Sequence, residues 1–160
     1  ACDEADIDMA IHPDDPPWDM FGLPRIITGE ESYEKLFAAV PNKHNGITFC
    51  TGSLGAGRWN DLPEMAAKYA KRIYFAHIRQ LKYCGETDFT EAGHLTGAGN
   101  LDIYGIVKAL VENGFEGYVR PDHGRNIWGE DGKPGYGLYD RALGAAYLNG
   151  LFEAIEKDRR

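Results

Sequence analysis

Short apolar runs alternate with amphipathic segments along the chain. The runs are residues 7–11, 46–49, 72–76 and 117–120. Most of them carry β-branched or aromatic residues, as buried parallel strands do. Apolar residues recur at helical spacing in residues 31–40, 62–72, 102–113 and 138–157. Strands that alternate with helices predict an α/β fold with a parallel sheet and right-handed crossovers.

Local signals mark the ends of the expected helices. Asp61 and Glu64 form a capping pair around Pro63 at the start of the second helix, and Gly114 follows the third. The last helix is expected to bury four residues of its apolar face: Leu143, Tyr147, Leu151 and Ile155. Residues 126–137 contain several Gly and Pro turn signals, which predict a long loop.

The first residues resemble the last turn of a helix that stands directly before a strand. We therefore expect the chain to begin inside an element, with more polypeptide before it in a parent protein. The chain has 160 residues, whereas a complete (β/α)₈ barrel typically needs about 250. This chain is too short to be a whole barrel of that kind.

Composition excludes several classes of protein. The net charge is −8, which argues against a nucleic-acid-binding surface. A membrane span needs about 20 consecutive apolar residues, and the chain has no such stretch; its acidic first residues do not resemble a signal peptide. The three cysteines cannot all pair, so we expect a reducing, cytoplasmic setting.

Residues that bind metals follow the four predicted strands. His12, Cys50 and His77 end the first three, and Asp122 follows the fourth with His123 beside it. The carboxyl ends of parallel strands lie at one mouth, where α/β active sites are found. A single strand-end histidine is more often structural, but four residues of metal-ligand type at equivalent positions favour a first-row divalent metal.

Nearby residues are candidates for substrate binding. Arg79 and Arg125 follow the third and fourth strands, and arginine suits a bidentate grip on a carboxylate. An ordinary ion pair is the alternative for both. Trp18 closes an acidic, proline-stiffened loop that starts at His12, and Tyr136 lies in the long loop before the last helix.

Two further segments carry weaker expectations. The glycine-rich residues 50–55 provide free backbone N–H groups near the mouth, which could hold a carboxylate or hydroxyls. His44 is expected to be an exposed loop residue at the opposite face, and Cys84 is not expected to be a ligand.

Five motifs together resemble mannonate dehydratases. They are His-Pro-Asp-Asp-Pro-Pro (12–17), Phe-Gly-Leu-Pro-Arg-Ile (21–26), Cys-Thr-Gly-Ser-Leu-Gly (50–55), Arg-Pro-Asp-His-Gly-Arg (120–125) and Pro-Gly-Tyr-Gly-Leu-Tyr-Asp-Arg-Ala-Leu-Gly (134–144). The combination is specific, although no single motif is, and the similarity runs through essentially the whole chain.

The resemblance implies a metal-dependent hydro-lyase on a xylose-isomerase-like (β/α)₈ barrel. Such enzymes convert D-mannonate to 2-dehydro-3-deoxy-D-gluconate and water during hexuronate (glucuronate) breakdown, with Mn²⁺ or Fe²⁺. The family's metal ligands match His12, Cys50, His77 and Asp122, and its acid–base residues match His123 and Tyr136. On ligand softness alone a thiolate also suits Zn²⁺.

The resemblance also implies that part of the enzyme lies elsewhere. Residues 1–160 correspond to the C-terminal half of the family's barrel, four βα units of eight. The first expected partner is therefore an N-terminal half of the barrel, which belongs either to the same parent chain or to a separate one. A small sugar-acid substrate and further copies in a homo-oligomer are the other two. The alternatives are a sugar isomerase or epimerase of the same superfamily, or a half-barrel that is inactive until paired.

Overall fold

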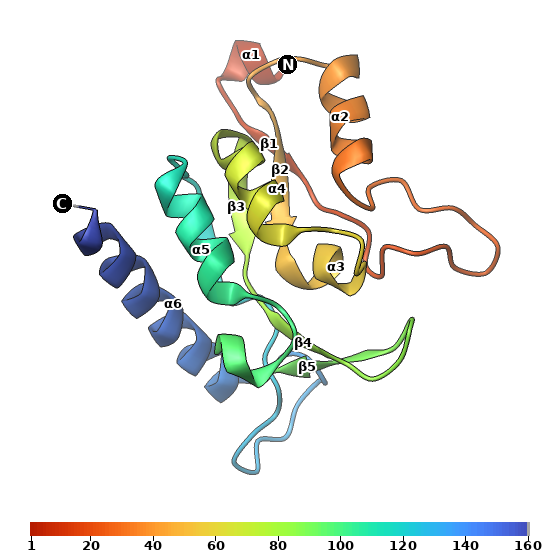
Figure 1. The fold of residues 1–160 in the computed structure, drawn as a ribbon. Helices are drawn as coiled ribbons and strands as arrows, with labels where there is room; N and C mark the ends of the chain where they lie inside the picture. Colours follow the sequence, from red (N-terminus) through yellow and green to blue (C-terminus); the bar gives the residue numbers. More distant parts are fainter. Residues whose placement is uncertain (160) are drawn as a thin grey trace.

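A computed structural model describes residues 1–159 (Figure 1). In chain order the helices and strands are α1 (Cys2–Ala5), β1 (Met9–Ile11), α2 (Glu30–Ala39), β2 (Asn45–Cys50), α3 (Thr51–Ala56), α4 (Leu62–Tyr69), β3 (Ile73–His77), β4 (Gln80–Tyr83), β5 (Phe89–Ala92), α5 (Ile103–Glu112), β6 (Tyr118–Arg120) and α6 (Leu138–Asp158). Short 3₁₀ turns cover Ala70–Arg72 and Thr96–Ala98. The four expected strands and four expected helices are all confirmed.

The main sheet has four strands in the order β1-β2-β3-β6, and every neighbouring pair is parallel. This confirms the predicted α/β class. The pairing places Cys50 directly opposite His77, so two of the predicted ligands lie side by side at the carboxyl ends of β2 and β3. Within the described chain β1 and β6 are the two edges of this sheet.

Helices α4, α5 and α6 pack side by side (Figure 1). Aromatic rings of α2 and α4 also contact each other. The core between helices and sheet is apolar; it includes Ile47, Phe49, Leu54, Met65, Ile73, Ile103, Ile106 and Leu110. The predicted caps are confirmed, because Asp61 accepts from the Glu64 N–H at 3.0 Å. Gly114, at φ +78°, follows α5 as a left-handed residue that glycine adopts without strain.

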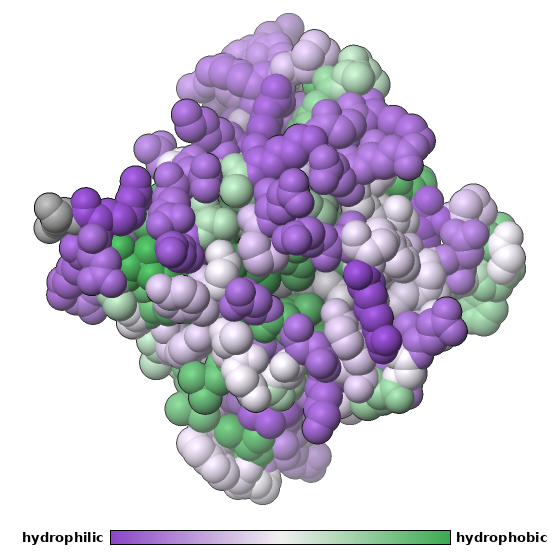
Figure 2. Space-filling model, viewed as in Figure 1, coloured by the Kyte–Doolittle hydropathy of each residue, from purple (hydrophilic) through white to green (hydrophobic). Residues whose placement is uncertain are grey.

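The outward side of these helices is largely hydrophilic, with smaller apolar patches among the polar residues (Figure 2). None of the helices in residues 1–159 combines the length and the apolarity that a membrane crossing requires.

Two elements were not expected from the sequence: residues 80–92 form the antiparallel β4–β5 hairpin, and residues 51–56 form helix α3. Two expectations about single residues were wrong. His44 is buried, because it lies directly before β2 beside the segment that leads into β1: the Met9 N–H donates to its carbonyl, and its Nδ1 lies 2.7 Å from Asp8 Oδ1. Leu143 is 49% exposed, because α6 faces the core through Gly144 and Leu148 instead.

Candidate metal centre

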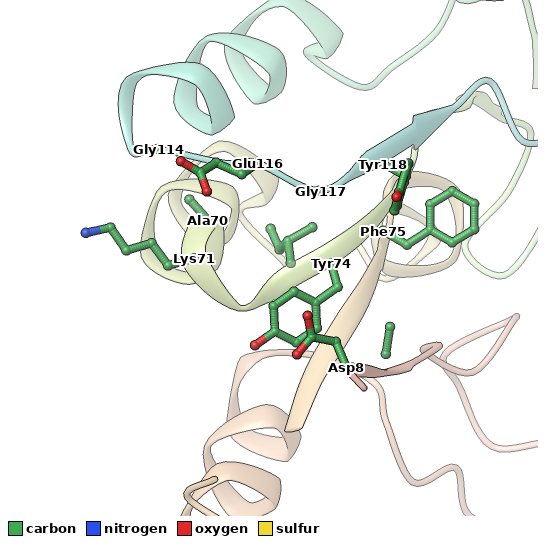
Figure 3. Close-up of a pocket in the computed structure, with 11 residues that line it drawn as sticks. Asp8, Ala70, Lys71, Tyr74, Phe75, Gly114, Glu116, Gly117 and Tyr118 are labelled. Carbon is green, nitrogen blue, oxygen red and sulfur yellow. The ribbon is translucent and has the colours of Figure 1, made fainter. Parts of the chain in front are cut away.

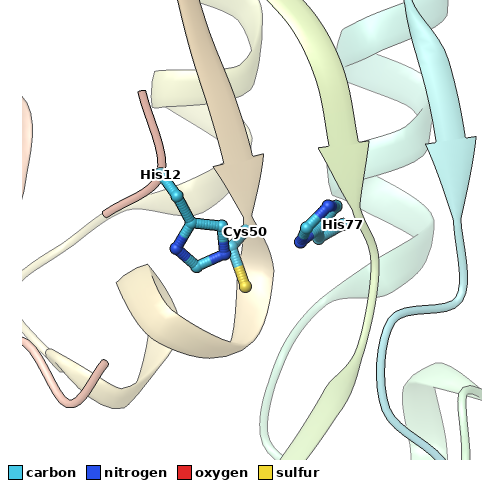
Figure 4. A group of neighbouring side chains, drawn as sticks. All are labelled: His12, Cys50 and His77. Atoms are coloured by element: carbon cyan, nitrogen blue, oxygen red, sulfur yellow. The ribbon is translucent and has the colours of Figure 1, made fainter. Parts of the chain in front are cut away.

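His12, Cys50 and His77 form a compact group of metal-binding side chains. Each offers one ligand atom, and these atoms all lie within 4.8 Å of one another. The two imidazoles lie on either side of the Cys50 thiol, one after β1 and the other at the end of β3 (Figure 4). Parallel pairing of β1, β2 and β3 brings them together, because it aligns the carboxyl ends of the three strands.

Asp122 lies beside this group. Its Oδ2 is 3.6 Å from the Cys50 sulfur, and its Oδ1 is 3.5 Å from His77 Nδ1. The carboxylate is buried, follows β6 and also accepts from Arg120 at 2.9 Å. The four residues that the strand ends predicted as ligands therefore meet in one place.

Each of the two histidines has a ring nitrogen that is available to a metal ion. His12 Nδ1 lies 2.6 Å from the Pro13 carbonyl oxygen, which can only accept, so Nδ1 carries the hydrogen and Nε2 keeps its lone pair. Both ring nitrogens of His77 are buried, and neither has a hydrogen-bond partner in residues 1–159. Such groups are costly unless something binds them, and a metal ion would satisfy one of them.

The protonation states also suit a metal. Burial lowers the pKa of His77 to about 4, which keeps its imidazole neutral and able to coordinate. Burial raises the pKa of Cys50 to about 12, so the thiol holds its proton until a cation displaces it. The exposed imidazole of His12, the buried imidazole of His77, the buried thiol and the adjacent buried carboxylate together fit a first-row divalent metal.

The glycine-rich segment continues from β2 directly into helix α3. Cys50 is the N-cap of α3, and its sulfur accepts from the Ser53 N–H at 3.5 Å and from the Ser53 hydroxyl at 3.1 Å. Binding of a carboxylate or hydroxyls by N–H groups of this segment stays a prediction.

The two predicted acid–base residues lie next to each other. The rings of His123 and Tyr136 are 5.7 Å apart between centroids. Backbone pairing holds their loops together, since the Gly124 N–H donates to Gly135 and the Gly137 N–H donates to Gly124, both at 2.9 Å. His123 directly follows the candidate ligand Asp122, so the pair stands beside the metal centre.

Arg79 is enclosed by acidic side chains of the chain itself. It is only 2% exposed; Nη2 lies 2.6 Å from Asp15 and Nη1 lies 3.1 Å from Glu91. Nε is 3.8 Å from Asp122. These pairs match the ion-pair alternative, while contact with a substrate stays a prediction.

The other two candidate substrate-binding residues also have partners within the chain. Arg125 grips Asp140 with both branches of its guanidinium, at 2.9 Å and 3.0 Å. Trp18 packs edge-on against Phe89, with 6.0 Å between ring centroids. Their substrate roles also stay predictions.

Glu91 contacts both Arg79 and His123, and the sequence pattern did not predict it as a site residue. It lies on β5, a strand of four residues that is too short to show an alternating pattern. The only signal in the sequence was an acidic residue shortly before the glycines at positions 93, 97 and 99, and acidic residues are common on any protein surface.

A cavity of about 620 Å³ lies away from the metal centre (Figure 3). It is lined at the amino ends of three strands, by Asp8 and Ala10 at β1, Tyr74 and Phe75 on β3, and Tyr118 on β6. None of the candidate ligands borders it. The cavity lies at the sheet strands β1, β3 and β6. The metal centre remains the candidate site, because the candidate ligands and proton-transfer residues lie at or beside it and none of them lines the cavity.

Solved structures define the class of this protein. A D-tagatose 3-epimerase-like protein matches 99% of the chain with a TM-score of 0.66 at 16% identity, and the chain covers 52% of it. A xylose isomerase domain protein from Alicyclobacillus acidocaldarius matches 92% of the chain with a TM-score of 0.60 at 14% identity, and the chain covers 50% of it. The chain therefore has the α/β fold of about half of a xylose-isomerase-like barrel, with a candidate metal site at its strand ends.

Closer relatives identify the family. The family model described as D-mannonate dehydratase (UxuA) matches residues 1–160. Mannonate dehydratases of Thermotoga petrophila and Lactococcus lactis subsp. cremoris are 56% and 54% identical over 99% of the chain. The mannonate dehydratase structure from Streptococcus suis matches 98% of the chain with a TM-score of 0.92 at 50% identity. The chain belongs to the mannonate dehydratase family.

The chain spans less than half the length of these relatives. It covers 45% of the Thermotoga petrophila protein and 46% of the Streptococcus suis chain.

Proposed function

We propose that residues 1–160 are the C-terminal half of a (β/α)₈ barrel that dehydrates D-mannonate to 2-dehydro-3-deoxy-D-gluconate. The observation that carries this proposal is the convergence of His12, Cys50 and His77 within 4.8 Å, with Asp122 alongside. Membership of the mannonate dehydratase family supports the substrate. Hexuronate breakdown is the setting that the family resemblance implies, and the three cysteines, which cannot all pair, favour a reducing, cytoplasmic compartment.

The open sheet supports a second barrel half as partner. Met9 on β1 is 61% exposed and Tyr118 on β6 is 81% exposed, although both are large apolar side chains on edge strands. Unpaired edges with apolar side chains invite pairing with further strands. Four more strands would close the barrel and fill the 620 Å³ cavity, since barrel interiors are packed with side chains. A homo-oligomer of closed barrels belongs to the same proposal.

The reaction removes a proton from the carbon next to the carboxylate and expels the hydroxyl from the following carbon. His12, Cys50, His77 and Asp122 would hold the divalent metal, which we propose is Mn²⁺ or Fe²⁺. When bound, the metal supplies positive charge against the negative charge that develops on the substrate. The thiolate of Cys50 also suits Zn²⁺, so metal analysis of the purified protein is part of the test.

His123 and Tyr136 would carry the protons. One side chain takes the proton from carbon, and the other protonates the departing hydroxyl, which leaves as water. Their rings stand 5.7 Å apart, which lets the two groups act on neighbouring carbons of one substrate. Arg79 contacts His123, and its charge is shared with Asp15 and Glu91.

The test is product analysis with the assembled barrel and D-mannonate. A 2-keto-3-deoxy acid supports the proposal, because only dehydration forms it. A ketose or an epimer would instead support the isomerase or epimerase alternative. His123→Ala should bind metal as the parent does and lose turnover, and parental turnover by this variant would contradict the assignment. The chain alone, compared with the assembled barrel, tests whether a half-barrel is inactive.

A further inference from the structure

Glu91 makes a direct contact with the imidazole of His123. Its Oε1 lies 2.8 Å from His123 Nδ1, and both side chains are about three-quarters buried. Glu91 is presented by the β4–β5 hairpin, which leaves the barrel pattern after β3. The hairpin therefore brings a carboxylate to the back of the proposed acid–base histidine.

The contact has a chemical consequence for the ring. A carboxylate only accepts hydrogen bonds, so a bond to Glu91 requires that His123 Nδ1 carry a hydrogen. In a neutral imidazole the other nitrogen, Nε2, then has the free lone pair. The hydrogen bond thus selects one of two tautomers and holds the ring in one orientation, as a carboxylate does in Asp–His pairs.

Glu91 is itself held from behind. Nη1 of Arg79 donates to the same Oε1 at 3.1 Å, while Nη2 is occupied by Asp15. The backbone of Arg79 is bonded twice to the Thr51 hydroxyl, at 2.7 Å and 2.8 Å. Glu91 is therefore fixed against a buried, anchored cation.

One competing arrangement exists. Nη1 of Arg79 also contacts His123 Nδ1. A guanidinium N–H can only donate, so this contact is a hydrogen bond only if Nδ1 lacks a hydrogen. In that arrangement two lone pairs, on Nδ1 and on Glu91 Oε1, would face each other at 2.8 Å. Donation from Nδ1 to Glu91 avoids this repulsion, because Nδ1 and Nη1 then both donate to Oε1, at 2.8 Å and 3.1 Å. Nη1 also lies 3.4 Å from Nε2, whose lone pair can accept from it until a substrate takes its place, and Arg79 keeps its bond to Asp15.

We propose that Glu91 is a positioning residue for His123. It keeps the hydrogen on Nδ1, so that Nε2 is the atom that takes a proton from the substrate or returns one to it. The role of Nε2 in proton transfer rests on the proposed function. The hydrogen bond and the tautomer it selects do not depend on which sugar acid is bound.

The first test reads the tautomer without measuring activity. Histidine labelled with ¹⁵N is introduced, diamagnetic Zn²⁺ is added, and the His123 signals are identified by their loss in His123→Ala. We expect Nδ1 to be protonated in the parent and in Glu86→Ala, an exposed control on the hairpin tip. Glu91→Ala removes the acceptor, so Nη1 of Arg79 can donate to Nδ1 and the hydrogen should move toward Nε2. An unprotonated Nδ1 in the parent, or an unchanged tautomer in Glu91→Ala, would overturn the proposal.

The second test measures turnover by the assembled barrel. Glu91→Ala should lower kcat by about 10- to 100-fold, as losses of orienting partners do, with KM and metal content unchanged. Glu91→Asp, which keeps the carboxylate on a shorter side chain, should recover part of the loss. In a His123→Ala background, Glu91→Ala should have no further effect, and an equal further loss there would refute action through His123. If the parent does not dehydrate mannonate, the proposed function fails while the tautomer measurement still decides the role of Glu91.

Discussion

Gly52 lies in α3 directly against the side chain of Arg79. A Cβ at this position would lie 1.6 Å from Arg79 Nε and 2.5 Å from its Cγ and Cδ. Arg79 has little freedom to retreat, because its backbone is bonded to Thr51 and its guanidinium to Asp15 and Glu91. We therefore predict that Gly52→Ala displaces the arginine and weakens its ion pairs.

The expected free-energy change has opposing contributions. Replacing glycine by alanine inside a helix normally stabilises by about 0.5–1 kcal/mol. Overpacking a dense core costs about 1–3 kcal/mol, and breaking a buried ion pair costs about 3–5 kcal/mol. The carboxylates of Asp15 and Glu91 keep some contact with water, which reduces the last cost. Gly52→Ala should thus lower the free energy of unfolding by about 2–4 kcal/mol.

Urea unfolding of the parent and two variants measures this effect. Gly150→Ala is the matched control, because Gly150 also lies in a helix but has no atom within 4 Å of the new Cβ. The control should be stabilised by about 0.5–1 kcal/mol, so the two glycines should respond with opposite signs. A Gly52→Ala protein as stable as the parent would show that Arg79 is not packed against α3.

Three further predictions concern charge, metal and assembly. Burial tends to raise the pKa of Asp140, but hydrogen bonds from Arg125 outweigh it and hold the pKa below its ordinary value. Asp140→Asn should therefore lower the free energy of unfolding by about 1–3 kcal/mol at pH 7, and urea unfolding at pH 7 and at acid pH should show this difference shrink as the carboxylate is protonated. Cys50→Ala should weaken Mn²⁺ binding by more than about tenfold in calorimetry, whereas Cys84→Ala, at an exposed position, should bind as the parent does. Tyr118→Lys should prevent association with the other barrel half, and unchanged complex formation by light scattering would contradict the role given to the β6 edge.

The strand-end ligands could be predicted because they depend on few assumptions. Apolar runs located β2 and β3, and parallel topology requires that their carboxyl ends coincide. Cys50 and His77 then had to be neighbours, and the register places them opposite each other. His12 and Asp122 follow from the same rule applied to β1 and β6.

The last helix shows where periodicity was insufficient. Helix α6 can be turned about its own axis in several ways that direct apolar residues toward the core, and the orientation expected from the sequence buried Leu143. The observed orientation of α6 buries Gly144, where a Cβ would lie 2.5 Å from atoms of the His94 ring. Close approach to a histidine selected the small residue, and no pattern within the helix contains that information.

By itself the sequence determined the α/β class, the parallel sheet and the set of ligands at its carboxyl edge. These properties follow from local period and from a topology that has few alternatives. Only the tertiary structure decided which charged groups meet around Arg79 and that Glu91 stands behind His123. The reason is physical: strand period repeats over neighbouring residues, whereas an ion pair or a hydrogen bond depends on the positions of single atoms brought together by distant segments of the chain.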